Sequence, residues 1–142
     1  MDLAALKRDW TGFEFDTAEF KVTEQQMLDF ALSCGETEAR FTDPSHPDFR
    51  APTTFTAKFS GRRMLPEEFP QLSRRGFDAG KCVQQLAPVR PGDTLTGTST
   101  IHDIFEKTGR SGSMIFIVHR MEFRNQSDEL VSIVDWRMVQ QP

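Results

Sequence analysis

Apolar residues recur at helical spacing in one stretch early in the chain. Four of them stand at i, i+3, i+4 and i+7 and so share one helical face: Met27, Phe30, Ala31 and Cys34. Leu28 and Leu32 add a second apolar stripe beside the first. We therefore expect a helix over about 23–34 that is buried on most of its circumference.

Both ends of this helix carry local signals. Thr23 can act as the N-cap, and Gln26 stands three residues later, which is the spacing of a capping box. Gly35 follows the last apolar residue and can adopt the left-handed conformation that ends many helices. We interpret this segment as the central helix of the fold, with the later strands wrapped around it.

The second half of the chain has the alternation and the Thr, Ile and Val content that are typical of strands. Turn-forming residues divide it into four predicted strands: 82–89, 94–105, 113–124 and 129–139. The segment 106–112 contains two glycines and predicts a hairpin loop between the second and the third. Strands joined in this way pair antiparallel.

The first half contributes shorter elements. Residues 1–9 are expected to form a short helix or an arm, and 13–22 a short first strand. The β-forming residues 53–59 predict another strand, and Pro66 followed by acidic residues predicts the start of a short helix. The whole chain is thus expected to be a single α+β domain, residues 1–142, with an antiparallel sheet of five or six strands around one central helix.

Composition narrows the classes of function. The formal net charge of −4 argues against a nucleic-acid partner, because such proteins usually carry a basic surface. No apolar run of about 18 residues is present, so no membrane-spanning helix is expected. The start of the chain lacks the apolar core of a signal peptide. Cys34 and Cys82 belong to no CxxC or His/Cys cluster; we expect both to be reduced and partly buried, and the location to be cytoplasmic.

Several short motifs occur in the same order as in one known family. They are Phe30–Glu36, Phe41–Asp43, Ala51–Phe55, Val89–Leu95, Glu106–Gly112, Asn125-Gln126 and Glu129–Val131. Each alone is weak, but together they resemble the N-terminal, FAS1-like dehydratase domain of the MaoC-like dehydratases. The resemblance covers roughly residues 12–139 and implies a hot-dog fold.

The resemblance also implies a reaction. Family members hydrate or dehydrate acyl thioesters carried on coenzyme A or acyl carrier protein, with no further cofactor and no metal. In active members the loop after the helix reads Gly-Asp-x-Asn-Pro-x-His. Here the aligned stretch is Gly35–Phe41, so Glu36 takes the place of the Asp, and Phe41 takes that of the His. A phenyl ring cannot carry a proton, and the usual Asp/His dyad is therefore broken.

Candidate site residues follow from this alignment. Glu36 is the candidate catalytic base, although a solvated loop carboxylate is the commoner explanation of such a residue. The substrate path is expected to involve the following residues: Gly35, Phe41, Pro52, Thr53, Thr54 and Phe55. Phosphate contacts are expected from Arg62, Arg63, Arg74 and Arg75, with Lys81, Arg90, Lys107 and Arg110 as further cations. The same cations can instead solvate a loop or meet acids of a partner.

The three histidines are weaker candidates. His46 stands on the loop after the helix and is more plausibly a surface residue than a substitute for the missing histidine. His102 and His119 fall within predicted strands. We interpret both as hydrogen-bonded sheet histidines or interface residues.

Three functions are compatible with these features. The favoured one is the substrate-binding subunit of an acyl-thioester dehydratase or hydratase, paired with a second hot-dog subunit that supplies Asp and His. The second is an independent hot-dog hydratase or thioesterase that uses Glu36. The third is a non-catalytic protein that binds acyl-coenzyme A. Because hot-dog domains seldom stand alone, we expect a homodimer or heterodimer at least.

Overall fold

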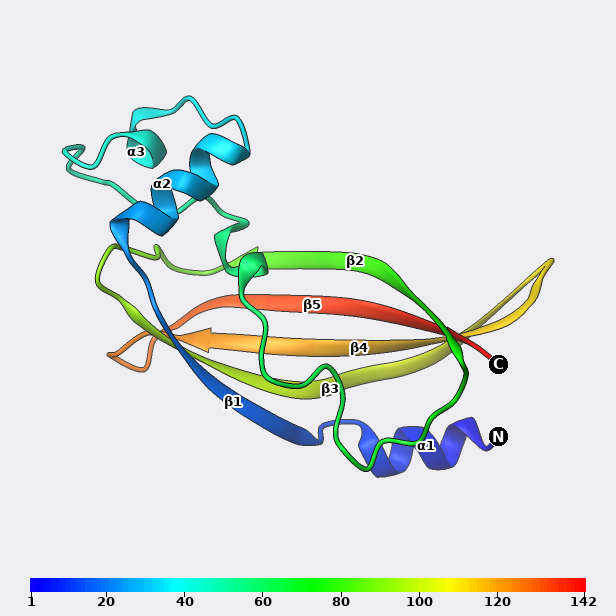
Figure 1. The fold of residues 1–142 in the computed structure, drawn as a ribbon. Coiled ribbons are helices and arrows are strands. Elements are labelled where there is room, and N and C mark those ends of the chain that lie inside the picture. Colours follow the sequence, from blue (N-terminus) through cyan, green and yellow to red (C-terminus); the bar gives the residue numbers. More distant parts are fainter.

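Five strands form one antiparallel sheet in the computed structural model, which describes every residue from Met1 to Pro142 (Figure 1). They are β1 Glu14–Lys21, β2 Arg75–Gln85, β3 Thr94–Gly109, β4 Gly112–Arg124 and β5 Leu130–Gln141. Their order across the sheet is β1-β3-β4-β5-β2. The expected α+β class and antiparallel sheet are confirmed, and β1 and β2 form the two edges.

The helices are short and lie outside the sheet. They are α1 Leu3–Trp10, α2 Glu24–Ser33, α3 Ala39–Thr42 and the 3-10 helix η1 Phe55–Lys58. The expected N-terminal arm is α1, which is capped by the Asp2 carboxylate and buries Leu6 in the core beside β3. None of these helices has both the length and the apolar composition that a membrane crossing requires.

The local signals at the ends of α2 are confirmed. The Thr23 side chain accepts a hydrogen bond from the Gln26 backbone N–H, and the Gln26 side chain accepts one from the Thr23 N–H, each at 3.2 Å. At the other end, Gly35 has a φ of +73°. The Gly35 N–H donates to the Leu32 carbonyl, and the Glu36 N–H donates to the Ala31 carbonyl. These two hydrogen bonds form a Schellman motif.

The expectation that α2 is buried on most of its circumference is wrong. Only Met27 and Ala31 are buried, while Leu32 is 65% exposed and Cys34 is also exposed. The helix lies at one end of the sheet, and the segment between η1 and β2 crosses the sheet beyond it (Figure 1). Cys82 is exposed as well, so the expectation that both cysteines are partly buried is also wrong.

Several predicted boundaries differ from the observed ones. Residues 53–59 contain η1 in place of a strand, because this segment has no strand neighbour and instead buries Phe55 and Phe59. The turn that begins at Pro66 does not continue as a helix, since Pro70 lacks the N–H that another turn would use. At the β3–β4 hairpin, the strands run on to Gly109 and Gly112 and leave a turn of only two residues.

The edge strand β2 begins earlier than expected, at Arg75, because it pairs with β5 from the Arg75–Gln141 pair onward. None of its residues is buried. A bulge interrupts the pairing between Asp78 and Lys81, and Gly80 within it has a φ of +90°. The outer edge of the sheet is therefore a long, solvent-facing strand with one irregularity.

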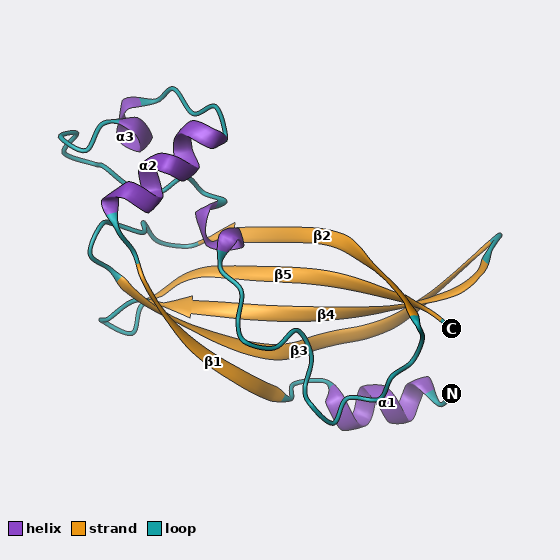
Figure 2. Cartoon of the chain, in the orientation of Figure 1, coloured by secondary structure: helices purple, strands orange, loops and turns teal.

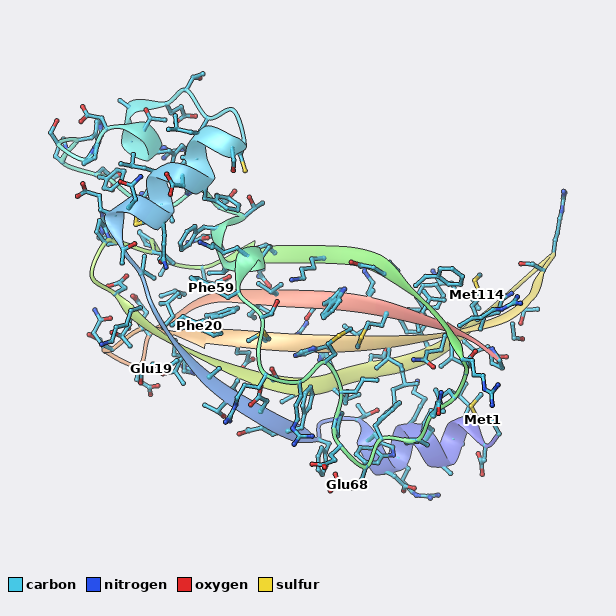
Figure 3. The ribbon with its side chains drawn as sticks, in the orientation of Figure 1. Met1, Glu19, Phe20, Phe59, Glu68 and Met114 are labelled. Atoms are coloured by element: carbon cyan, nitrogen blue, oxygen red, sulfur yellow. The ribbon has the colours of Figure 1, made fainter.

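Two apolar clusters fill the core. The larger lies below η1 and α2 and contains Met27, Phe55, Phe59 and Phe123. Phe20 and Phe59 face each other across it in Figure 3, with ring centroids 4.7 Å apart. The smaller cluster lies beneath α1.

Between η1 and β2 the chain crosses the face of the sheet without helix or strand (Figure 2). We call residues Ser60–Met64 of this segment the strap. The buried carboxylate of Asp16 in β1 holds it: one oxygen accepts the Arg62 backbone N–H at 2.7 Å, and the other accepts from the Arg62 side chain at 3.2 Å. The strap thus forms a fixed cover over the middle strands.

Candidate functional site

The loop after α2, where the family places its catalytic residues, is built as a helix end. Glu36 uses its backbone N–H in the Schellman motif, and its half-exposed side chain makes no hydrogen bond or ion pair. Glu38 is paired with Arg40 at 2.9 Å. His46 accepts a hydrogen bond from the Asp48 N–H on the same loop and makes none with Glu36. The structure thus pairs the Glu36 carboxylate with no base in this loop.

Phe41, at the position of the missing histidine, is part of the packing. Its side chain is 6% exposed, and the Arg40 guanidinium carbon lies 4.7 Å from its ring centroid. The residue belongs to the short helix α3, which packs against α2. Phe41 therefore closes the loop onto the helix and exposes no polar atom.

The run Ala51–Phe55 anchors the loop to the core. Pro52 and Phe55 are buried, and the Phe55 ring stands edge-on to Phe30 with centroids 5.5 Å apart. Only the side chains of Thr53 and Thr54 are exposed. The three surface hollows of the structure contain no residue between Gly35 and Phe55.

The arginines fall into two groups. Arg62, Arg63 and Arg90 are paired with acids: Asp16, Glu67 and Asp48 respectively. Arg74 and Arg75 are exposed at the start of β2, and neither takes part in an ion pair. They immediately precede Gly76, which lines a hollow; Lys81 of the same basic set also has no ion pair and lines another hollow.

The hollow at Gly76 is a groove along the sheet edge. Gly76, Phe77 and Asp78 of β2 form one wall, and residues 136–140 of β5 with Met64 of the strap form the other. We call it the edge groove. The Phe77 side chain is 58% exposed, and the Trp136 indole N–H donates to the Asp78 carboxylate at 2.9 Å.

A second hollow lies behind the strap. Strands β2, β4 and β5 form its floor and the strap its cover, and the enclosed cavity is small, with a volume of about 20 Å³. We call it the His119 pocket, after the one histidine in its wall. Phe59, Met121, Val134 and Trp136 make it largely apolar. It shares Met64 and Trp136 with the edge groove, so the two hollows adjoin.

The interpretation of His119 as a hydrogen-bonded sheet histidine is wrong. Its side chain is 3% exposed, and neither ring nitrogen has a hydrogen-bond partner in the protein. The ring lies between Phe15, at 5.1 Å between centroids, and Trp136, at 6.2 Å. His102, by contrast, is exposed on β3.

Burial controls the ionisation of His119. Removal from water is the main cause, and the positive charge of Lys81 acts in the same direction; together they lower the pKa of the ring from 6.5 to about 4. The carboxylate of Asp16 and the backbone of Met64 oppose this shift, although no protein atom forms a well-directed hydrogen bond with the ring. The imidazole is therefore neutral at physiological pH, with one donor and one acceptor nitrogen.

Sequence reasoning missed this pocket, but one signal was present. Ile115, Ile117, Met121 and Phe123 alternate along β4 and are all buried. His119 continues the same alternation, which places it on the inward face. Elsewhere the structure holds no group of three or more His, Cys, Asp or Glu side chains that could bind a metal ion.

Comparison with known proteins agrees with this architecture. The model of the family described as FAS1-like, dehydratase domain region matches residues 9–134. The chain belongs to this family. A UPF0336 protein from Streptomyces coelicolor is 35% identical to this FAS1-like dehydratase domain, over 66% of this chain and 69% of that protein.

Solved structures confirm the hot-dog fold of the FAS1-like dehydratase domain. A MaoC-like dehydratase from Rhodospirillum rubrum superposes with a TM-score of 0.62 at 23% identity, over 93% of this chain and 94% of that one. The C-terminally truncated HadBC complex of Mycobacterium tuberculosis, a 3R-hydroxyacyl-ACP dehydratase, gives 0.67 at 18% identity and covers 98% of both chains. The resemblance to MaoC-like dehydratases is thereby confirmed.

Proposed function

We propose that this chain is the substrate-binding subunit of an acyl-thioester dehydratase or hydratase. It would act beside a second hot-dog subunit that supplies the Asp and His of the active loop. The acyl group is carried on coenzyme A or on acyl carrier protein.

Phe41 is the observation that carries this proposal. The chain keeps the fold of the family, yet the position where active members have histidine is a phenyl ring packed into the loop. Glu36, the remaining carboxylate, has neither a histidine nor any other hydrogen-bond partner. A dehydration needs one group to remove a proton and one to protonate the leaving hydroxyl. The loop of this chain offers no such pair.

The free edge of the sheet supports a partner subunit. Strand β2 is unpaired on its outer side, and none of its residues is buried. Such an edge is a ready site for another strand. The HadBC structure, which has the same fold, is a complex of hot-dog chains. We therefore expect the catalytic subunit to bind along β2.

The cations next to the edge groove support a phosphate-bearing ligand. Arg74 and Arg75 have no acidic partner within the chain, whereas Arg62 and Arg63 are paired with Asp16 and Glu67. Guanidinium groups bind phosphate well. The diphosphate of coenzyme A, or the single phosphate of an acyl carrier, would lie at this end of the groove.

The decisive experiment measures hydration of a short trans-2-enoyl-coenzyme A. The chain alone should show none of the turnover of typical enzymes, which is about 10 per second. A complex with a hot-dog protein that carries the Gly-Asp-x-Asn-Pro-x-His loop should turn the substrate over. Replacing the histidine of that loop should abolish the activity, whereas Glu36→Gln in this chain should not change it. Full activity of the chain alone would identify an independent enzyme instead.

Binding supplies a second test with a matched control. Arg74→Ala together with Arg75→Ala should weaken acyl-coenzyme A binding, and wild-type binding should weaken with added salt, since exposed charges are screened within about 8–10 Å. Arg8→Ala together with Arg40→Ala removes the same charge from two exposed ion pairs that line none of the hollows, and leaves the free pair in place. Equal loss in both variants would show a general charge effect. Binding without any activity in the presence of a partner would indicate a non-catalytic acyl-coenzyme A binding protein.

A further inference from the structure

His119 carries two unused hydrogen-bonding atoms in a pocket whose ten lining residues include five hydrophobic ones. Its ring is almost fully buried, and neither nitrogen has a partner. An unsatisfied polar group in such a place destabilises the folded chain, and most buried polar groups are therefore paired. A histidine in this position is consistent with a role that needs the free nitrogens.

The walls of the pocket define the kind of group that would fit. Most of their surface is apolar, and the cations nearby are already engaged. The Lys81 ammonium donates to the Ala57 carbonyl at 2.9 Å and lies over the Trp136 ring. Arg63 is paired with Glu67. Lys81 has no acidic partner, but its ammonium is directed at the Ala57 carbonyl and would have to leave this contact to pair with an anionic group in the pocket.

The strap is an anchored cover that ends in one free side chain, that of Met64. Its first half is fixed, because the Arg62 N–H is bonded to Asp16 and a side chain at Gly61 would approach the Asp16 carboxylate to 2.6 Å. Met64, beyond this anchor, is 54% exposed. A long thioether side chain can change rotamer easily. Met64 is the one strap residue that lines both hollows, so a change of its rotamer alters the opening between them.

The edge groove leads to this pocket. It starts beside Arg75, runs along Phe77 and ends at Met64 and Trp136, which also line the His119 pocket. A ligand whose phosphates lie at Arg74 and Arg75 could extend its chain along the groove and reach the ring of His119.

We propose that the His119 pocket binds an uncharged, oxygen-bearing group, a hydroxyl or a carbonyl, on the acyl chain of the ligand. The neutral imidazole donates to this oxygen or accepts from its hydroxyl, while the apolar walls hold the carbons around it. The inference rests on the proposed function for the identity of the ligand. It adds a preference for oxygenated acyl chains over plain hydrocarbon chains.

The test compares matched acyl-coenzyme A thioesters that end in a methyl, a hydroxyl or a carboxylate group. Calorimetric titration of the chain, alone and with its partner, should show about three- to tenfold tighter binding of the hydroxyl form, as expected for one neutral hydrogen bond. The carboxylate form should not be favoured. His119→Phe should abolish the preference, and His119→Gln, which keeps a donor and an acceptor, should retain part of it. His102→Phe, on the exposed face, is the matched control and should change nothing.

A probe without a thioester separates this inference from the proposed function. Pentan-1-ol added to the wild-type chain should shift the imidazole nitrogen resonances of His119 and leave those of His102 unchanged. If the alcohol shifts the His119 resonances but no thioester binds, the pocket does bind a hydroxyl group and the proposed function is wrong. If neither the alcohol nor the hydroxyl-bearing thioester distinguishes His119 from His102, the pocket holds water only and the inference is overturned.

Discussion

The loop after α2 and the His119 pocket differ in how their polar groups are used. In the loop, the backbone N–H groups of Gly35 and Glu36 complete a helix end, and Phe41 is buried. In the pocket, both nitrogens of His119 remain without a partner. The first region stands where the family has its active site, but it has the structure of a packed scaffold. The second matches no sequence motif, yet it contains the buried ring nitrogens that have no hydrogen-bond partner. Motif position and chemical capacity are thus separate properties of this chain.

The largest expected effect concerns the scaffold role of the loop. Phe55→Ala should lower the free energy of unfolding by about 3–5 kcal/mol, because the ring is fully buried. Phe30→Ala should lower it less, by about 2 kcal/mol, because Phe30 on α2 is only partly buried. Chemical denaturation of the two variants makes the comparison. A larger loss in Phe30→Ala would restore the interpretation of α2 as an enclosed central helix.

The pocket should make folding sensitive to acid. The pKa of His119 is about 4 in the folded chain and close to 6.5 when unfolded, so the unfolded chain binds an extra proton between these values. The free energy of unfolding should therefore fall by up to about 3 kcal/mol as the pH is lowered from 6.5 to 4. His119→Phe should lack this component, whereas His102→Gln should keep it. Parallel pH profiles for all three proteins would contradict the burial of a neutral ring.

The attachment of the strap to the sheet should depend on the Asp16 carboxylate. Hydrogen bonds from Arg62 outweigh the effect of burial and lower the pKa of this carboxyl. Asp16→Asn should lower the free energy of unfolding by about 1–2 kcal/mol and speed tryptic cleavage after Arg62 and Arg63. Asp9→Asn, which removes only an exposed pair with Arg8, is the control and should have little effect. Unchanged cleavage in Asp16→Asn would show that the strap is held by its other contacts.

The smallest expected effect is at Glu36, the candidate catalytic base in the family motif. Glu36→Gln should change the free energy of unfolding by less than about 0.5 kcal/mol, because its side chain has no partner. Denaturation measures this directly. A loss of more than about 1 kcal/mol would mean that the carboxylate has a role in the loop beyond the backbone contacts of the helix end.

The features that the sequence could predict are mostly local. The capping box of Thr23 and Gln26 and the left-handed Gly35 involve residues a few positions apart, and alternation identified β3, β4 and β5. These patterns are visible because each residue's environment repeats with the period of its own element.

The features that the sequence could not predict depend on distant residues. Thr56 in η1 is bonded to Ser132 on β5 at 2.6 Å, and β2 begins at Arg75 because β5 lies beside it. The pocket combines the strap with three strands, so the partners of His119 cannot be read from its neighbours in sequence. Only its inward orientation was predictable, from the alternation along β4.

The bulge in β2 has a consequence for what can pair with this edge of the sheet. An exposed edge strand invites any extended chain to continue the sheet, which is the first step towards aggregation. The irregularity between Asp78 and Lys81 divides that edge into two short segments, 75–78 and 81–85. A strand that docks without a matching irregularity can follow only one of them. The bulge therefore restricts which strands can extend the sheet at β2. It favours a strand with a matching irregularity over unselective polymerisation.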